Sequence, residues 1–472
     1  MNRPIRRVAL LAMLMTLVLL INVCVSYLAR QDSLNANPQN RRVTDAAFAQ
    51  DRGAILVGNT AIAETVESKD QFKFQRRYPQ GDLYASVTGY FSYNFGASDL
   101  ELSYGRQLSG SDSSQFVNRL IDLATGAKPR GASVQTTLNA RAQQAAAKAM
   151  GDKKGAVVAL DPSTGAVLSM YTSPSYDPNR LATHDLPDAR KAWQALTGDT
   201  KNRPMANRAV REIFPPGSTF KVIVAAAALE AGYEPESEID TSSYKLPQTS
   251  TTLSSNCGDS QTLAAALARS CNAGFARLGV KLGKDALRDQ AEKFGFGTKP
   301  LSDIPSVASR FPDEMDTPQT GLASIGGYDV AATPLQMAMV AAAIRNDGVV
   351  MQPYLVDSVR SADLQVLSQT RPSQLRLATS AANAAKLRQM MLGVVTSGTG
   401  TRAAIDGVNV GGKTGTANSD NKRAPYAWFI SFADNPNVAV CVFIQDSEMD
   451  ATDVAGGRLA APVAKAVIEA LR

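Results

Sequence analysis

An almost uninterrupted apolar run, Val8–Ala29, constrains this chain more than any other feature of its sequence. A helix of that length, rising about 1.5 Å per residue, crosses the hydrocarbon core of a bilayer. Arginines among residues 1–7 predict, by the positive-inside rule, a cytoplasmic N-terminus and a chain that continues outside the cytoplasm. The alternative is a cleaved signal peptide, but Tyr27 stands where cleavage needs a small residue. We therefore expect one helix over residues 8–29 to anchor the chain in the cytoplasmic membrane.

The rest of the 472-residue chain is long enough for two extracytoplasmic domains. Residues 30–130 are irregular and rich in Asn, Gln, Ser, Tyr and Gly, with short strand-like pieces such as residues 53–57. This composition is typical of a spacer domain rather than of an enzyme core. Longer periodic segments begin near Gly131, so we place the second domain at residues 131–472.

Strand-like and helix-like segments are mixed in the second domain. Asn139 is expected to cap an Ala-rich helix over residues 140–150, and Pro215-Pro216-Gly217 to open a helix over residues 218–232. The other expected helices cover 262–283, 334–346 and 461–471, and the expected strands cover 133–138, 156–160, 166–171, 426–432 and 438–444. Strands at both ends with helices between them predict an α+β fold, in which one sheet is flanked by helices.

Composition excludes two broad classes of function. The chain has 49 Lys+Arg and 43 Asp+Glu, a net charge of +6, which is too small and too dispersed to indicate nucleic-acid binding. Four cysteines and one histidine, His184, cannot assemble a usual zinc site, because Cys24 lies in the apolar run and Cys441 in a strand-like segment. We expect no metal and no other cofactor. We also expect His184, which stands in polar sequence, to be an exposed loop residue.

The near absence of histidine restricts how a serine could be activated. A serine nucleophile needs a neighbouring base to accept its proton, and that base is most often an imidazole. In Ser218-Thr219-Phe220-Lys221 the only candidate is a lysine, whose amine can be neutral near pH 7 when burial and a second cation disfavour its charge. At a helix N-terminus this spacing puts Ser218 and Lys221 on one face, where free backbone N–H groups favour negative charge. The alternative is that Ser218 merely caps its helix.

A second motif, Ser270-Cys271-Asn272, is selected by its context. Neither Ser-x-x-Lys nor Ser-x-Asn is specific by itself, since the first recurs at Ser242 and Ser419 and the second at Ser92, Ser254 and Ser419. The segment at Ser270 interrupts an Ala-rich helical region, where a hydroxyl and an amide can be held facing a cleft. Its alternative role is a corner between two helices, held by local hydrogen bonds.

The third motif, Lys413-Thr414-Gly415, allows two interpretations. Residues 407–414 satisfy the phosphate-loop pattern G-x-x-x-x-G-K-[ST], which would indicate a nucleotide-binding ATPase. That loop must lead directly into a helix, whereas polar sequence and strand-like segments follow here. On an edge strand, Lys413 and Thr414 could instead hold a substrate carboxylate, and Gly415 would let substrate backbone approach closely.

The three motifs in this order resemble those of the penicillin-binding proteins and serine β-lactamases. Their spacing looks like that of the penicillin-binding transpeptidase domain, and segments 207–209, 215–221, 333–338 and 427–429 resemble the class B, monofunctional branch. The resemblance covers the chain from about Ser133 to the C-terminus, and extends more loosely to the spacer through Arg52-Gly53 and Leu100-Glu101. It implies an antiparallel sheet flanked by helices, with an all-helical lobe.

This resemblance implies a serine D,D-transpeptidase that cross-links peptidoglycan stem peptides ending in D-Ala-D-Ala. Ser218 would attack the D-Ala-D-Ala carbonyl and form an acyl-enzyme. Lys221 would act as its base, and Ser270 would relay a proton to the leaving D-Ala. β-Lactams would acylate Ser218 as mimics of the substrate.

The resemblance also implies a set of binding residues. Asn272 would bind the donor peptide's amide, and Lys413 and Thr414, with Thr416 adjoining, would position the terminal carboxylate. Backbone N–H groups of Ser218 and Thr416 would form the oxyanion hole, in which each donor contributes about 2.7 to 4 kcal/mol.

Cys271 departs from the commoner form of the second motif. Cys257 precedes it by a short loop, and outside the cytoplasm a disulfide between the two is permitted. Such a bridge would staple the loop to the cleft wall and contribute about 3 kcal/mol. The alternative is two free buried thiols.

Several activities remain open on the same fold. A D,D-carboxypeptidase would use water as the acceptor, and a β-lactamase would need a group that activates water, which the sequence does not identify. A β-lactam sensor is disfavoured, because only residues 1–7 are expected in the cytoplasm. No segment before Ser133 looks large enough for a glycosyltransferase, so the resemblance implies a membrane polymerase of the RodA/FtsW type as partner.

Overall fold

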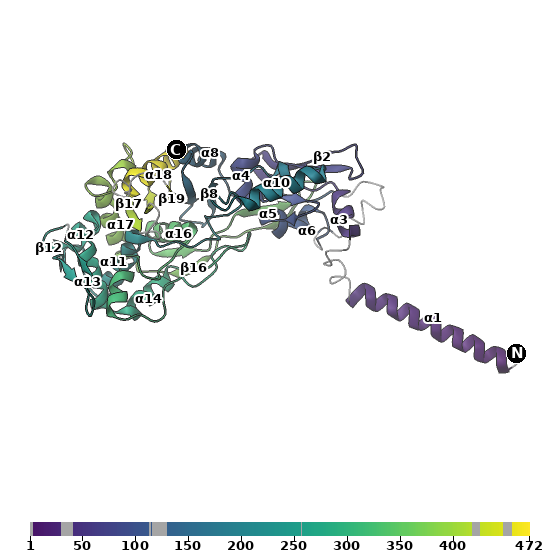
Figure 1. Ribbon diagram of the computed structural model, residues 1–472, viewed down its shortest axis with the longest axis horizontal. Coiled ribbons are helices and arrows are strands. Elements are labelled where there is room, and N and C mark those ends of the chain that lie inside the picture. The colour runs from purple at the N-terminus through teal and green to yellow at the C-terminus, as the bar shows by residue number, and fades with distance from the viewer. Residues whose placement is uncertain are drawn as a thin grey trace.

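The computed structural model describes residues 3–29, 41–112, 115, 130–255, 257–417, 425–446 and 456–472. Helix α1 (Arg3–Ala29) is the one helix in these ranges that is long and apolar enough to cross a membrane. It extends away from the rest of the chain (Figure 1), and nearly all its described side chains are exposed. An exposed apolar surface of this size marks a segment that packs against something other than the protein itself. The helix therefore fits a single membrane anchor with the remaining chain beyond it.

A five-stranded antiparallel sheet forms the centre of the molecule. Its order is β17-β18-β19-β7-β8, with bounds Val410–Ala417, Tyr426–Ala433, Val438–Asp446, Lys154–Leu160 and Val167–Ser173. Side chains alternate between the two faces, as strand geometry requires: Trp428 and Ile430 of β18 enter one core cluster, and Ala427 and Phe429 the other. The sheet is thus buried on both faces, and β17 is an edge strand.

Helices cover both faces of this sheet. Helix α8 (Ala140–Met150), capped by the Asn139 side chain as predicted, and α18 (Gly456–Ala470) pack on one face, and α16 (Pro334–Arg345) packs on the other. The remaining large helices are α11 (Lys221–Glu230), α12 (Leu263–Arg269), α13 (Asn272–Leu282), α14 (Lys284–Lys293), α15 (Thr317–Ala323) and α17 (Ala381–Thr396). Helices α12 to α14 form a lobe at the end of the molecule farthest from α1 (Figure 1). The predicted α+β architecture with a helical lobe is confirmed.

Two predicted helices begin or end differently from the expectation. The helix expected over 218–232 starts with a 3₁₀ turn, η2 (Gly217–Phe220), before α11 begins. The helical region expected over 262–283 is interrupted at the second motif, as predicted, and divides into α12 and α13 at Ser270, whose backbone is left-handed at φ 62°. A left-handed residue cannot continue a right-handed helix, so Ser270 makes a corner.

A second sheet crosses the predicted boundary between residues 130 and 131. Its order is β15-β14-β6-β1-β2-β3, with bounds Val366–Gln369, Val356–Arg360, Ser133–Thr136, Ile55–Val57, Thr60–Glu67 and Phe74–Arg77. Strand β6 pairs with β1 in parallel and with β14 antiparallel. The spacer therefore shares a sheet with the following segments, a pairing that short strands far apart in sequence do not reveal.

The helix α10, with 13 residues, and a set of short elements complete the described chain. The helices are α3 (Arg41–Phe48), α4 (Gly81–Thr88), α5 (Asp99–Ser103), α6 (Gly105–Leu108), α9 (Asn179–Ala182), α10 (Leu186–Gly198) and η3 (Thr401–Ala403). The strands are β4 (Phe91–Ser92), β5 (Gly96–Ala97), β9 (Glu238–Asp240), β10 (Tyr244–Lys245), β11 (Thr252–Leu253), β12 (Ser260–Thr262), β13 (Val349–Met351) and β16 (Gln374–Leu377).

The prediction for His184 is half right. The residue lies in the loop between α9 and α10, as expected, but its side chain is only 10% exposed, and its Nδ1 is hydrogen-bonded to the carboxylate of Asp70. The ring packs against Phe72, with centroids 4.7 Å apart, and lies near Phe48. Aromatic residues of the spacer thus cover a segment whose own polar sequence suggested exposure.

Candidate active site

Ser218 is held in a turn that the rest of the protein fixes from two sides. Trp428 of β18 donates from its indole nitrogen to the carbonyl of Pro215 at 2.9 Å. The backbone N–H of Gly217 donates to the carbonyl of Gly326 at 3.1 Å. Gly217 is left-handed at φ 55°, and a Cβ at Gly326 would lie 2.0 Å from the Gly217 carbonyl oxygen, so both positions require glycine. The turn presents Ser218 half-buried at the start of α11.

Lys221 lies one turn further and is fully buried. Its Nζ donates to the Ser270 carbonyl at 2.8 Å and to Oδ1 of Asn272 at 2.7 Å, and lies 3.2 Å from the Ser270 hydroxyl. Burial, followed by the charge of Lys413, holds the pKa of Lys221 well below the ordinary lysine value. No direct hydrogen bond joins Ser218 to Lys221 among the described residues. Catalytic hydrogen bonds are often long without substrate and shorten in the complex.

Lys413 approaches the same hydroxyl from the opposite wall. Its Nζ donates to Ser270 Oγ at 2.9 Å and to the carbonyl of Thr414 at 2.9 Å, and the side chain is fully buried. Burial lowers the pKa of Lys413 to about 7. Within the described part of the chain, neither Lys413 nor Lys221 forms an ion pair with a carboxylate. The Ser270 hydroxyl therefore joins two buried amines whose charge nothing neutralises.

The corner at Ser270 explains how one residue meets both lysines. Ser270 closes α12, and its left-handed backbone turns the chain directly into α13, whose first residue is Asn272. A non-glycine residue in this conformation is uncommon and frequently marks a functional site. The two interpretations of this motif, a polar site and a corner between helices, are therefore compatible. The corner between α12 and α13 is what brings the Ser270 hydroxyl and the Asn272 amide to Lys221.

A disulfide joins Cys257 and Cys271, with Cα atoms 5.9 Å apart. Cys271 lies between Ser270 and Asn272, so the bridge ties the corner to the loop that precedes β12. The side-chain amide of Gln261 donates to the Cys257 carbonyl at 2.6 Å and holds that loop on its other side. The alternative of two free thiols does not apply to this structure.

Strand β17 carries the third motif along the edge of the sheet, where Lys413 pairs with Ile430 of β18. Thr414 is buried and Thr416 is exposed. Gly415 was expected to let substrate backbone approach closely. In the structure it is the nucleophile turn that approaches, since a Cβ at Gly415 would lie 2.8 Å from the Pro216 carbonyl oxygen. Its missing side chain lets the strand approach the nucleophile turn.

The phosphate-loop alternative is wrong, because Lys413 and Thr414 lie inside a β-strand rather than in a loop that opens a helix. The other matches to the first two motif patterns are called decoys here. Of these, Ser242 lies in a bend before β10 and Ser92 lies in β4, and neither opens a helix. The decoy at Ser419 and part of the one at Ser254 lie outside the described residues. Structure and sequence thus select the same three motifs.

Thr399, in the loop after α17, was not predicted from the sequence. Its Oγ1 lies 2.6 Å from Oγ1 of Thr414, and its backbone N–H donates to the carbonyl of Ala268 at 3.2 Å. The only signal in the sequence is its position between Gly398 and Gly400, because close packing often requires glycine. Among the described residues, no group of His, Cys, Asp and Glu could hold a metal ion.

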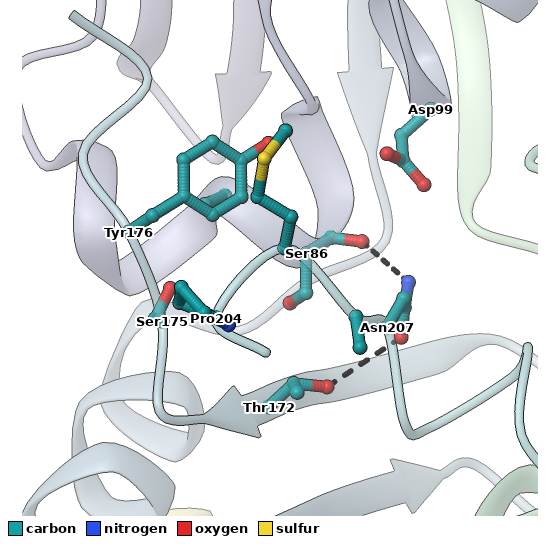
Figure 2. A pocket seen from close by; sticks show the side chains of 10 residues that line it. Ser86, Asp99, Thr172, Ser175, Tyr176, Pro204 and Asn207 are labelled. Carbon is teal, nitrogen blue, oxygen red and sulfur yellow. Dashed lines mark hydrogen bonds between the residues drawn. The ribbon is translucent and has the colours of Figure 1, made fainter. Parts of the chain in front are cut away.

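A small polar cavity lies apart from this site, between the spacer and β8. Figure 2 shows that Asn207 bridges Ser86 and Thr172 across it, with hydrogen bonds of 2.8 and 3.5 Å. Asp99 and Tyr176 also line it. Its volume of about 10 Å³ holds at most about one water molecule. The cavity is therefore part of the interface between the spacer and β8, and it is too small to be a substrate site.

Comparisons with known proteins agree with this geometry. Residues 155–469 match the family model of the penicillin binding protein transpeptidase domain, and residues 52–134 match that of the penicillin binding protein A dimerisation domain. The peptidoglycan D,D-transpeptidase PbpA of Mycolicibacterium smegmatis is 42% identical over 488 residues, which cover 100% of this chain and 99% of the relative. The protein of the same name from Mycobacterium tuberculosis is also 42% identical, over 489 residues.

Solved structures show the same similarity. Penicillin-binding protein A from M. tuberculosis, as its ceftriaxone acyl-enzyme complex, superposes with a TM-score of 0.87 at 40% identity, covering 90% of this chain and 99% of that chain. Its penicillin G acyl-enzyme complex superposes with a TM-score of 0.84 at 41% identity, covering 89% of this chain and 99% of the other.

Proposed function

Because the chain belongs to the penicillin-binding protein transpeptidase family, we propose that Ser218 is its nucleophile and Lys221 the base that activates it. The chain is a serine peptidoglycan D,D-transpeptidase inhibited by β-lactams. One observation carries the assignment of residues: the Ser270 hydroxyl lies 3.2 Å from Lys221 Nζ and 2.9 Å from Lys413 Nζ, with both amines buried.

Acylation begins when neutral Lys221 takes the proton of the Ser218 hydroxyl. A buried amine that has lost its proton keeps a lone pair, which a protonated amine lacks. The Ser218 oxygen attacks the carbonyl of the penultimate D-Ala, and the resulting oxyanion accepts hydrogen bonds from the backbone N–H groups of Ser218 and Thr416. Backbone donors that already point at the site where the negative charge develops stabilise it without reorganising.

The proton then leaves Lys221 by way of Ser270. The Ser270 hydroxyl gives its own proton to the departing D-Ala nitrogen and regains one from Lys221, so the C–N bond breaks without releasing an anion. The amine of a second stem peptide attacks the acyl-enzyme and loses a proton to Lys221. Lys221 passes a proton to the departing Ser218 oxygen as the ester C–O bond breaks, which restores the Ser218 hydroxyl and neutral Lys221. Charged Lys413 directs the Ser270 hydrogen away from itself, because an ammonium can only donate.

Two further contacts would orient the donor peptide. Asn272, exposed at the start of α13, would hold the peptide amide, and Lys413 with Thr414 and Thr416 would hold the terminal carboxylate. The pairing of a cation and hydroxyls with a carboxylate is the usual chemistry of such a site. Gly415 contributes by letting β17 lie against the nucleophile turn.

Membrane topology follows from the same proposal. The arginines before α1 would keep residues 1–7 in the cytoplasm, residues 8–29 would span the membrane, and the spacer (30–130) and transpeptidase domain (131–472) would lie outside. A RodA/FtsW-type glycosyltransferase would supply the glycan strands that this chain cross-links.

Labelling with a fluorescent penicillin tests the nucleophile. The full chain in detergent should be labelled, and Ser218→Ala should not. Ser242→Ala, which changes the serine of a decoy motif, should be labelled like the wild type. Labelling of Ser218→Ala would refute the assignment.

The acceptor separates the alternatives on this fold. With a stem-peptide donor and an added amine acceptor, a transpeptidase forms the amide product, whereas a D,D-carboxypeptidase forms only the hydrolysed acid. A β-lactamase would release the penicilloyl group rapidly, whereas a transpeptidase keeps it bound.

A further inference from the structure

Thr399 joins the two walls of the active-site cleft. Its backbone N–H donates to the carbonyl of Ala268 at 3.2 Å, in the last turn of α12 just before Ser270. Its side-chain Oγ1 lies 2.6 Å from Oγ1 of Thr414 on β17. One residue is therefore bonded to the wall that carries Ser270 and to the strand that carries Lys413.

The backbone of this loop is positioned by packing that does not involve the Thr399 side chain. A Cβ at Gly398 would lie 2.5 Å from the Ala268 carbonyl oxygen, and one at Gly457 would lie 2.1 Å from the Thr399 carbonyl oxygen. The backbone N–H of Gly400 donates to the Val394 carbonyl at 2.9 Å. Because glycines and backbone hydrogen bonds fix the loop, exchanging the hydroxyl of Thr399 for a methyl group should change the hydroxyl pair alone.

The hydroxyl pair limits which proton is available to a substrate. A threonine hydroxyl has one hydrogen to donate and two lone pairs. If Thr399 donates to Thr414, the single hydrogen of Thr414 is free for a carboxylate, which can only accept. If the bond runs the other way, Thr414 has none left to give. Thr414 is 7% exposed, so solvent has little access to its hydroxyl.

We propose that Thr399 is a positioning residue that donates to Thr414 and thereby points the Thr414 hydrogen at the carboxylate of the donor peptide or β-lactam. This inference rests on the proposed function, in which Thr414 binds that carboxylate. Thr399 is itself exposed, so its second lone pair can accept from solvent while its hydrogen is engaged. Charge-assisted hydrogen bonds of the kind it prepares are roughly twice as strong as neutral ones.

The test compares two β-lactams that differ only in the carboxylate. Second-order acylation rates of the full chain in detergent are measured with benzylpenicillin and with its methyl ester. Thr399→Val should slow acylation by benzylpenicillin about tenfold and leave the rate with the ester nearly unchanged. Thr399→Ser keeps the hydroxyl and should behave like the wild type. Thr401→Val, an exposed threonine two positions further, is the matched control and should have no effect.

Other results would overturn the proposal. Equal slowing of both compounds by Thr399→Val would assign the residue a purely structural role, and no slowing of either would remove any role. If Thr399→Val fails to unfold cooperatively on heating, Thr399→Ala replaces it with the same expectations. Mass spectrometry of the acylated wild type tests the proposed function separately, because it locates the label on Ser218 or on another residue. Its result does not depend on the rates measured with benzylpenicillin and its methyl ester.

Discussion

Two clusters of buried charge, one in the spacer and one at the candidate active site, differ in how their charges are paired. In the spacer, fully buried Glu101 accepts from Arg52 and Arg76 at 2.6 Å each and from the hydroxyl of Tyr78 at 3.2 Å. In the catalytic cleft, Lys221 and Lys413 are as deeply buried, but a neutral hydroxyl separates them, and no carboxylate among the described residues pairs with either.

The difference lies in whether a counter-charge accompanies burial. Burial raises the pKa of Glu101, but the charges of Arg76 and Arg52 outweigh burial, and the net pKa is lowered. For Lys221, burial and the neighbouring cation act in the same direction and lower the pKa. In the first cluster, Glu101 and the two arginines stay charged, and their pairing stabilises the fold. In the second cluster the charged form of Lys221 is disfavoured, which is the direction that a base near neutral pH requires.

The largest effect on the acylation rate should come from replacing Lys221, the buried base that has no counter-charge. Lys221→Met should slow penicillin acylation by about 10³- to 10⁴-fold, because general-base catalysis is lost. The melting temperature should stay equal or rise, since a methionine is buried without the desolvation cost of an amine. Lys245→Met, the lysine of a decoy motif, is the control for rate. A large fall in melting temperature would mean that Lys221 holds the fold together as Glu101 does.

The Glu101 cluster, whose charges are paired, should show the opposite pattern, in which stability falls and the acylation rate hardly changes. Glu101→Gln leaves two buried guanidinium groups without a counter-charge and should lower the free energy of unfolding by about 3 to 5 kcal/mol. Acylation by the protein that remains folded should hardly change. The exposed pair of Glu64 and Arg77, 4.0 Å apart, provides the control, because Glu64→Gln should cost less than about 1 kcal/mol. Denaturant unfolding measures both variants, and equal losses would contradict the comparison.

The disulfide should affect both stability and rate, each by less. Replacing Cys257 and Cys271 together by serine should lower the free energy of unfolding by about 3 kcal/mol, as expected for a loop of this length. Acylation should slow by about tenfold, because Ser270 and Asn272 flank the bridge and their placement loosens. Cys24→Ser, in α1, should change neither quantity. Unchanged acylation in the double variant would show that the corner holds its shape without the bridge.

The pH dependence of acylation sharpens the contrast between the two lysines. The second-order rate should rise with pH as Lys221 loses its proton, and fall again above about 7, where Lys413 loses its own. Lys413→Arg keeps its charge throughout this range and should remove the fall on the alkaline side. An alkaline limb that persists in Lys413→Arg would assign it to another group.

The chemistry was more predictable from sequence than the contacts that support it. Motif order, spacing and the single histidine singled out Ser218, Lys221, Ser270 and Lys413 as candidates, and the structure brings Lys221 and Lys413 to the Ser270 hydroxyl. Apolar runs also predicted the central strands β7, β8, β18 and β19, and an asparagine before an Ala-rich stretch predicted the capped helix α8. These signals are local or depend on residue types alone, so they survive without knowledge of the fold.

The remaining features arise only when distant segments meet. The sequence indicated an interruption of the helical region at Ser270, but not its left-handed backbone or its contacts with both lysines. Thr399 and Gly326 are placed by contacts with other segments, Thr399 with Ala268 and Thr414, and Gly326 with the nucleophile turn. His184 is buried by aromatic rings of the spacer, which its own polar neighbours cannot indicate.

We expect Lys221 to be an uncharged base in the folded protein at neutral pH, because its pKa lies well below the ordinary lysine value. NMR titration of the lysine side chains in the full chain in detergent tests this directly, with the Lys221 signal assigned from its absence in Lys221→Met. The signal should report a neutral amine at pH 7. A Lys221 signal that still reports a protonated amine at pH 7 would overturn its assignment as the base.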